Sequence, residues 1–158
     1  MKIYFDIGAN FGTDSLELAK DSNYQIYAFE PTPYLADYLR EKSTEFDNYH
    51  VIEKAVSDYH GNATFNITGY GPWMQSSLYN FRSDLSNNWK DGKSMYFTES
   101  IDVNVITLKE FCLENEINRI DYLHSDVQGC DLEVLIGLDD MINIIQAGVL
   151  ETTRNHDV

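Results

Sequence analysis

The chain has 158 residues, 43% of them hydrophobic, and this size and composition suit one globular domain with its own core. Its 26 acidic and 11 basic residues give a net charge of −15, which disfavours contact with nucleic acid and with anionic membranes. The charge suits cationic ligands, although solubility alone explains it equally well. No apolar run is long enough to cross a bilayer, and no secretory signal is visible at the N-terminus. We therefore expect no nucleic-acid partner and no insertion into a membrane.

The two cysteines, Cys112 and Cys130, lack the spacing of metal ligands. We expect reduced core thiols rather than a disulfide, which fits a cytoplasmic location. Histidine and acidic residues also lack ligand-like spacing, so no metal site is expected.

Strands and helices are expected to alternate in the first third of the chain. The expected elements, in chain order, are a strand at residues 2–7, a helix at 12–20, a strand at 24–30, a helix at 32–46 and a strand at 49–57. Thr32 is the expected N-cap of the second helix, and Pro33 lies in its first turn, where proline is tolerated.

The alternation is then interrupted and later resumes. The expected elements are strands at residues 62–68 and 100–107, a helix at 107–117, a strand at 120–127, a helix at 131–138 and a strand at 144–151. Thr107 and Glu110 have the spacing of a capping box at the start of the third helix. Between the two middle strands lies a long polar and aromatic segment, which we expect to be an insertion loop at about residues 69–99 within a single domain spanning residues 1–158.

Strand–helix–strand units form parallel sheets with right-handed crossovers, so the pattern predicts an α/β fold with an open, doubly wound, mainly parallel sheet. Ligands of such sheets bind at the carboxyl ends of the strands. Asp6, Glu30 and Asp126 each fall at the carboxyl end of an expected strand. Their shared position is the first indication of a functional site.

The turn after the first strand contains Gly8, Ala9, Asn10 and Gly12. Asn10 stands where the dinucleotide fingerprint G-x-G-x-x-G has its middle glycine, and no lysine follows the second glycine as in a P-loop. The loop has no basic residue to offset the repulsion between Asp6 and a phosphate. Both phosphate-binding interpretations are therefore disfavoured.

A cationic nucleoside suits the turn better. S-adenosylmethionine carries a sulfonium and an ammonium group but no phosphate, and Asp6 is placed to accept from the ammonium. Glu30, followed by Pro31, has the position of an acidic residue that binds both ribose hydroxyls. Residues 55–58 are expected along the adenine edge, although they also read as a simple turn. Taken singly, Asp6 as a strand-end turn residue and Glu30 as a cap are equally good interpretations.

Several motifs, quoted in chain order, resemble those of the FkbM-type methyltransferases: FDIGANFG, AFEPTP, AVSDYHGNATFNI, SSL, TLKEF and IDYLHSDVQGCDLEVLIGL. They cover residues 5–138, and their combination is more specific than the first two alone. The resemblance implies a Rossmann-like class I methyltransferase fold, S-adenosylmethionine as cofactor, and transfer to a hydroxyl oxygen of a small-molecule acceptor such as a sugar, lipid or secondary metabolite. The residues expected around the cofactor include those of the turn at residues 55–58. They are Asp6, Gly8, Ala9, Asn10, Gly12, Glu30, Pro31, Ala55, Val56, Asp58 and Asp126.

The resemblance also points to an acceptor site. Ser76 and Ser77 match the family's serine pair, expected near cofactor or acceptor, and Trp73 is one of the aromatic residues of the 69–99 loop that suit an acceptor pocket or, equally, the core. Asp126 is the first candidate to orient the acceptor or to contact the methionine part of the cofactor. His124 is the second, although a histidine within a strand is more often a core residue.

The chain departs from the family pattern at three points, one of which is that it starts directly at the first expected strand, without the usual preceding helix. The family usually has K-I-D-V-E-G where this chain has a histidine, a serine, Asp126, a valine, Gln128 and a glycine, so Gln128 replaces an acid. The antiparallel strand pair that usually closes the sheet is not apparent, which predicts an exposed edge on the last strand. We expect a second copy of the chain, or further residues of the same protein, to cover that edge.

Two other functions are compatible with the sequence. A binding module that holds the nucleoside without turnover fits the replacement of the acid by Gln128. A nicotinamide-dependent oxidoreductase fits the fold but is disfavoured by Asn10 and by the acidic turn.

Overall fold

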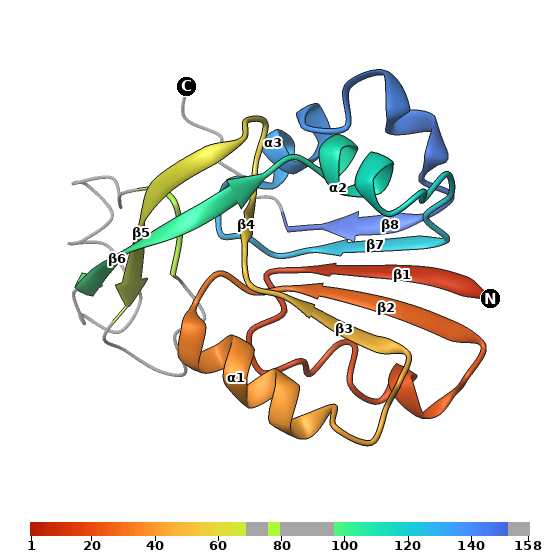
Figure 1. Ribbon diagram of the computed structural model, residues 1–158. Helices are drawn as coiled ribbons and strands as arrows, with labels where there is room; N and C mark the ends of the chain where they lie inside the picture. Colours follow the sequence, from red (N-terminus) through yellow and green to blue (C-terminus); the bar gives the residue numbers. More distant parts are fainter. Residues whose placement is uncertain (69–75, 80–96, 152–158) are drawn as a thin grey trace.

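A computed structural model of the chain describes residues 1–68, 76–79 and 97–151. A five-stranded sheet of entirely parallel strands, in the order β3-β2-β1-β7-β8, forms its centre (Figure 1). The order changes direction at β1 (Lys2–Ile7), which lies between β2 (Tyr24–Phe29) and β7 (Tyr122–Ser125). This arrangement confirms the open, doubly wound α/β fold predicted from the sequence.

The remaining elements of this sheet and its covering helices follow the expected alternation. They are the 3-10 helix η1 (Leu18–Lys20), α1 (Pro33–Lys42), β3 (Tyr49–Ile52), α2 (Leu108–Glu114), α3 (Asp131–Ile136), the 3-10 helix η3 (Asp139–Ile144) and β8 (Gly148–Leu150). Thr107 is the N-cap of α2, and its hydroxyl accepts from the Glu110 backbone N–H at 3.1 Å, as a capping box requires. Thr32 is the N-cap of α1 by position, but its side chain makes no capping hydrogen bond.

Alternation of side chains along β1 separates two cores. Phe5 and Ile7 pack with residues of α2 and α3, whereas Tyr4 packs with Leu39 of α1 on the opposite face. Helices therefore cover both faces of the sheet, as a doubly wound fold requires (Figure 1). Cys112 and Cys130 are both buried and free, which confirms the prediction of core thiols.

A second, three-stranded sheet in the order β4-β6-β5 stands beside the first. β5 (Gly61–Thr68) and β6 (Phe97–Ile106) pair antiparallel, and the short β4 (Ala55–Val56) pairs parallel to the end of β6. The inner side chains of this sheet form a third apolar cluster around Phe65 and Val105. This small sheet forms the wall opposite the carboxyl ends of the main strands.

Two local predictions are wrong. Residues 12–20 form turns and the short η1 instead of a helix, because Thr13 donates to Asp14 (3.2 Å) and the Ser15 hydroxyl bonds the Tyr49 hydroxyl (2.9 Å). Short polar side chains of this kind compete with helical hydrogen bonds. The expected strand at residues 49–57 is split at residues 53 and 54, so that β3 joins the main sheet and β4 joins the small one.

The strand β8 lies at one edge of the main sheet. Within the part of the chain that the structure describes, β8 pairs with β7 alone, and its outer edge is exposed. That a second subunit covers this edge stays a prediction. The expected insertion loop at residues 69–99 also stays a prediction, because most of these residues lie outside the described part of the chain. Among the described helices, none is long and apolar enough to span a membrane.

The turn after β1 makes its closest contact with the loop after β7. Gly8 has a φ of 83°, and a Cβ atom at this position would lie 2.2 Å from the Asp126 carbonyl oxygen. A real Cβ cannot approach a backbone oxygen so closely, and the positive φ is disfavoured for other residues. Gly8 therefore allows the two loops to meet at the carboxyl edge of the sheet.

Replacing Gly8 with alanine is expected to lower the free energy of unfolding by roughly 2–4 kcal/mol, because both strain and a backbone clash follow. Urea denaturation of the wild-type chain and the variant would measure this difference in the free energy of unfolding. The control is Gly61→Ala, which also has a positive φ but no atom within 4 Å of the added Cβ. Equal losses in the two variants would show that the contact with Asp126 is unimportant.

Candidate active site

A cavity of about 210 Å³ lies at the carboxyl ends of β1, β2 and β7, with residues of the small sheet on its other side. Leu35 of α1 and Phe65 of β5 contribute apolar walls. Of the predicted site residues, those that line it are Gly8, Ala9, Asn10, Glu30, Pro31, Ala55, Val56, Ser76, His124 and Asp126. The fold therefore brings together most of the residues that the sequence singles out.

Four predicted residues do not line the cavity. Asp6 is buried behind His124, Gly12 packs against Leu39, and Asp58 is exposed on a turn. Ser77 is also buried outside the cavity wall. Trp73 lies outside the described residues, so its role in an acceptor pocket stays a prediction.

Several lining residues were missed by the sequence reasoning. Phe11 follows Asn10 in the glycine turn, and the alternating pattern of β5 identifies Phe65 as an inward-facing residue. Lys54 is half-buried at the break between β3 and β4, which the expected continuous strand concealed. Around the cavity the described charged residues are Asp14, Glu30 and Asp126 against Lys54, so acidic groups predominate.

The glycine turn is fixed to the end of β2. The backbone N–H groups of Gly8 and Ala9 both donate to the Phe29 carbonyl, each at 3.0 Å. Asn10 has a φ of 49°, in the left-handed region that asparagine tolerates better than most residues. This conformation turns the Asn10 N–H toward Glu30, which accepts it at 2.9 Å.

Glu30 is a buried carboxylate with 4% of its surface exposed. One of its oxygens accepts from the Asn10 N–H and the other from the Thr32 N–H, at 2.8 Å. Burial raises the pKa of Glu30, and hydrogen bonds from the Thr32 side chain and from the Thr32 and Asn10 backbone N–H groups oppose that shift. A carboxylate has about four lone-pair sites, so Glu30 can still accept from a hydroxyl group of a ligand.

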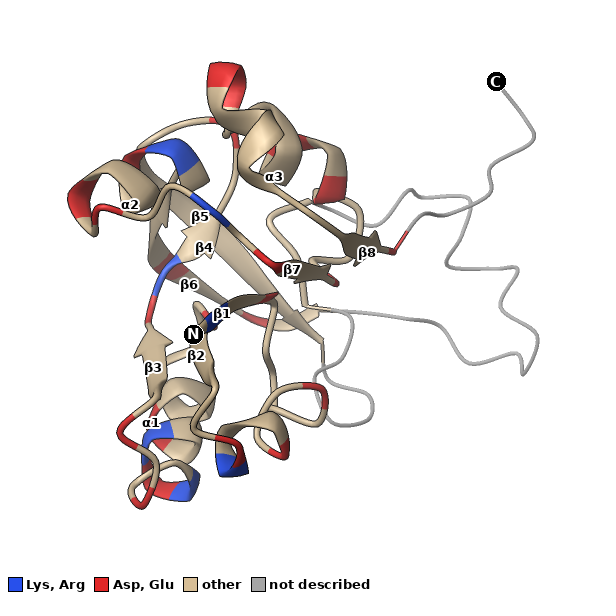
Figure 2. Cartoon of the chain, turned by 90° about the vertical axis from the view of Figure 1, so that its right-hand side faces the viewer, with Lys and Arg blue, Asp and Glu red and all other residues tan. Residues whose placement is uncertain are grey.

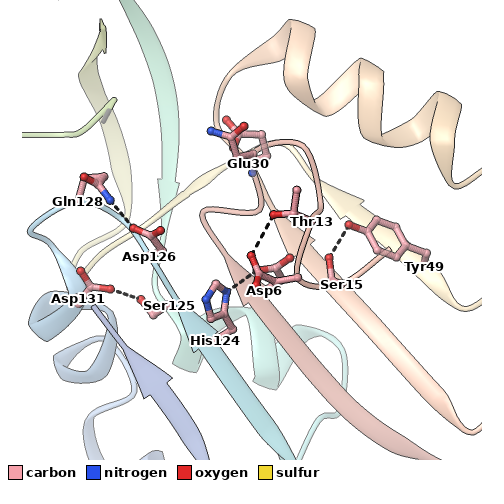
Figure 3. A network of polar contacts seen from close by, with 12 residues as sticks. Asp6, Thr13, Ser15, Glu30, Tyr49, His124, Ser125, Asp126, Gln128 and Asp131 are labelled. Atoms are coloured by element: carbon pink, nitrogen blue, oxygen red, sulfur yellow. Dashed lines mark hydrogen bonds and ion pairs between the residues drawn. The ribbon is translucent and has the colours of Figure 1, made fainter. Parts of the chain in front are cut away.

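Asp6 and His124 form a second polar contact. Their residues are register partners on the parallel strands β1 and β7, which puts both side chains on the same face. His124 Nδ1 lies 2.9 Å from Asp6 Oδ1, and this hydrogen bond raises the pKa of His124 (Figure 3). Asp6 is 1% exposed, and its other carboxylate oxygen is buried with no hydrogen-bond partner. Buried polar groups of this kind are normally satisfied, so a partner is expected.

The loop after β7 carries Asp126 and Gln128 and is held by Asp131. The Ser125 hydroxyl donates to Asp131 Oδ1 at 2.6 Å (Figure 3). Burial raises the pKa of Asp131, and the Ser125 hydroxyl and the backbone N–H groups of Val127 and Gly129 oppose that shift. Asp131 thus fixes the loop from within and does not itself line the cavity.

The serine pair supports this loop and the neighbouring small sheet. The Ser77 hydroxyl donates to the Gln128 carbonyl at 2.9 Å and accepts from the Tyr79 N–H at 3.1 Å. The Ser76 hydroxyl accepts from the Thr68 N–H at 3.2 Å. The contacts of Ser77 in this structure are therefore structural, whereas Ser76 also lines the cavity.

The described residues contain no group of three or more histidine, cysteine or acidic side chains arranged to hold a metal ion. The Cys130 thiol lines the cavity, but burial raises its pKa to about 11, so the thiolate is scarce at neutral pH. Chemistry at this cavity therefore falls to carboxylates and to the His124 imidazole. The acidic residues of the described chain lie mainly on the helices and loops around the sheet (Figure 2).

The contact between Asp6 and His124 predicts a pH-dependent stability. Because the pKa of His124 is raised on folding, its contribution is fully present below about pH 6.5 and is lost as the pH rises through the folded pKa. His124→Gln should therefore lower the free energy of unfolding by on the order of 1 kcal/mol more at pH 5.5 than at pH 9. Urea denaturation at both pH values measures this. In an Asp6→Asn background the pH dependence of the His124→Gln effect should disappear; its persistence would assign the effect to another group.

Comparison with known proteins finds relatives that are methyltransferases by name. The chain is 29% identical over 137 residues to the 2-O-methyltransferase NoeI of Sinorhizobium fredii. The matched region covers 85% of this chain and 56% of that protein. It is 28% identical over 145 residues to Methyltransferase 1 of Beauveria bassiana, covering 85% of this chain and 57% of that protein. The chain thus spans about half the length of these two relatives.

A further match is to the AMB antimetabolite synthetase AmbE of Pseudomonas aeruginosa, 28% identical over 165 residues, covering 87% of this chain and 8% of that protein. The sequence profile described as the methyltransferase FkbM domain matches residues 6–158. This match begins at Asp6 and includes every predicted site residue. The chain belongs to the FkbM methyltransferase family.

Proposed function

We propose that the chain transfers a methyl group from S-adenosylmethionine to a hydroxyl oxygen of a small molecule such as a sugar, a lipid or a secondary metabolite. The observation that carries the proposal is the buried carboxylate Glu30, which together with Asp14 and Asp126 lines a cavity at the carboxyl edge of a methyltransferase fold. A positively charged methyl donor matches this acidic surrounding, whereas a pyrophosphate does not.

The residues around the cavity fit such a donor. Asp6 does not line the cavity, so it would interact with the ammonium of the methionine part through water, and its unpartnered oxygen is the acceptor for that bond. Glu30 would accept from the ribose hydroxyls with its remaining lone pairs. Val56, Phe65 and Leu35 offer apolar contacts for the adenine ring.

When bound, S-adenosylmethionine supplies a methyl group already activated by the sulfonium, so the chain has mainly to bind and align the reactants. Asp126, at the cavity wall, would orient the acceptor hydroxyl and receive its proton. His124, held by Asp6, has its other ring nitrogen available for a second polar contact. Ser76 and Trp73 remain predicted acceptor residues.

The relatives support the class of acceptor. One of them is named a 2-O-methyltransferase, which is consistent with a hydroxyl oxygen as acceptor in this family. The same proposal includes a single domain over residues 1–158, a cytoplasmic location and a second subunit that covers the β8 edge. The runner-up is a module that binds S-adenosylmethionine without turnover, favoured by Gln128 at the position of an acid.

Calorimetry should distinguish these ligands. S-adenosylmethionine is expected to bind at least about tenfold more tightly than NAD, and Asp6→Asn should weaken its binding by about tenfold because an ammonium contact is lost. Binding of NAD in place of S-adenosylmethionine would refute the proposal. Release of S-adenosylhomocysteine with a panel of monosaccharides, phenols and alcohols would then separate the enzyme from a binding module.

Asp126→Asn should lower the rate of methyl transfer about 100-fold or more while changing S-adenosylmethionine binding only slightly, since the lost carboxylate acts on the acceptor. Transfer rates and calorimetric affinities measured on the same preparations test this. Asp102→Asn, the same change at an exposed site on β6, is the control. Parallel losses of binding and rate would instead assign Asp126 to the cofactor.

A further inference from the structure

The side chain of Gln128 joins two carboxyl groups from different parts of the sheet. Its amide nitrogen donates to Asp126 Oδ1 at 2.5 Å and to Glu151 Oε2 at 2.6 Å. Asp126 follows β7, and Glu151 follows the neighbouring strand β8, so parallel pairing brings both to the same edge. Figure 3 shows the contact between Gln128 and Asp126.

The amide is the group that this position requires. An amide nitrogen has two hydrogens and can donate to both carboxyl groups at once, whereas an acid here would add a third negative charge. The backbone of Gln128 is held in a left-handed conformation, with a φ of 54°, and its carbonyl accepts from the Ser77 hydroxyl. The replacement of the family's acid by Gln128 is thus matched by the contacts around it.

The contact with Asp126 changes the protonation of Glu151. A hydrogen bond with Asp126, then burial and the negative charges of Asp126 and Asp131, raise the pKa of Glu151 to about 7, and the Gln128 amide opposes this. Among the described residues, the titratable groups that face this carboxyl group are Asp126 from the loop after β7 and Asp131 from α3. Glu151 therefore binds a proton near neutral pH.

This pair extends from the cavity to the edge of the sheet. Asp126 and Gln128 line the cavity, and Glu151 lies behind them at the end of β8. We propose that Gln128 and Glu151 are positioning residues for the methyl transfer proposed above: Gln128 holds the two carboxyl groups together, and Asp126 receives the proton of the acceptor hydroxyl and shares it with Glu151.

The step is balanced without any further reactant. The acceptor oxygen bonds the methyl carbon while the carbon–sulfur bond of the donor breaks and its electron pair stays on sulfur. The hydroxyl proton passes to Asp126 and is shared with Glu151, and the products are the methyl ether, the neutral thioether and one protonated carboxyl group. This role rests on the proposed function, whereas the shared proton can be measured without it.

Carbon-detected NMR titration of side-chain carboxyl groups tests the pair directly. In the wild-type chain, a carboxyl signal should titrate with a midpoint near pH 7, and Glu151→Gln should abolish that step, which assigns it to Glu151. Gln128→Ala should move the midpoint upward, because a hydrogen bond that favours the ionised form is lost. Glu114→Gln, the same change at an exposed residue of α2 outside the cavity wall, should leave it in place.

Repeating the titration with bound ligands tests whether Asp126 and Glu151 lie close to the positively charged part of the donor. Bound S-adenosylmethionine should lower the midpoint by about one pH unit, because its positive charge favours ionised carboxylates, and S-adenosylhomocysteine should lower it less. With an acceptor from the panel, the transfer rate should rise through the same midpoint, and Glu151→Gln should remove that rise while changing kcat more than the KM for the donor.

The outcomes separate the two proposals. If no carboxyl group titrates above about pH 6, or if bound S-adenosylmethionine leaves the midpoint unchanged, this inference is wrong and the methyltransferase function is unaffected. If the midpoint lies near pH 7 but S-adenosylmethionine does not bind, the proposed function fails and the catalytic role of the pair fails with it.

Discussion

The close approach of two backbone loops at Gly8 is the constraint on which the site depends. A side chain at this position would collide with the Asp126 carbonyl, so only glycine lets the turn after β1 meet the loop after β7. That contact lies where the strand order changes direction, which is where open α/β sheets bind their ligands. The turn is also bonded to the end of β2, so three neighbouring strands share one edge of the cavity. Asp126 and Glu30 reach the same space for this reason.

An acidic edge of this kind must satisfy several carboxyl groups at once, and the chain does so in three ways. Glu30 is held by two backbone N–H groups, Asp6 by the His124 imidazole, and Asp126 by the Gln128 amide. Among the described residues, no lysine or arginine takes part in these hydrogen bonds, which leaves the cavity suited to a cationic ligand. One carboxylate oxygen of Asp6 stays unpartnered, and contact with Asp126 raises the pKa of Glu151 to about 7. Our proposals place ligand binding and proton transfer on different carboxyl groups.

Much of the fold and part of the site could be predicted from local sequence patterns. The apolar runs of β1 and β2, the turn around Gly8 and the cap at Thr107 are short-range features, and the structure contains them. The helix expected at residues 12–20 did not form because Ser15 bonds Tyr49, a residue distant in sequence. The break at Lys54 was missed for a similar reason, since pairing of β4 with β6 depends on a strand about fifty residues further along the chain. Local propensity cannot report such partners.

The sequence by itself determined the family, the parallel α/β arrangement and the acidic character of the strand ends, because motifs, hydrophobic periodicity and charge are properties of neighbouring residues. Only the tertiary structure decided which of those acidic groups face the cavity. It placed Asp6 behind His124, turned Ser77 toward the Gln128 carbonyl, and brought Glu151 from the last strand to within reach of Asp126. These contacts join residues that are up to 118 positions apart, and they form only when parallel strands align their carboxyl ends. The chemistry of the site therefore arises from the register of the sheet.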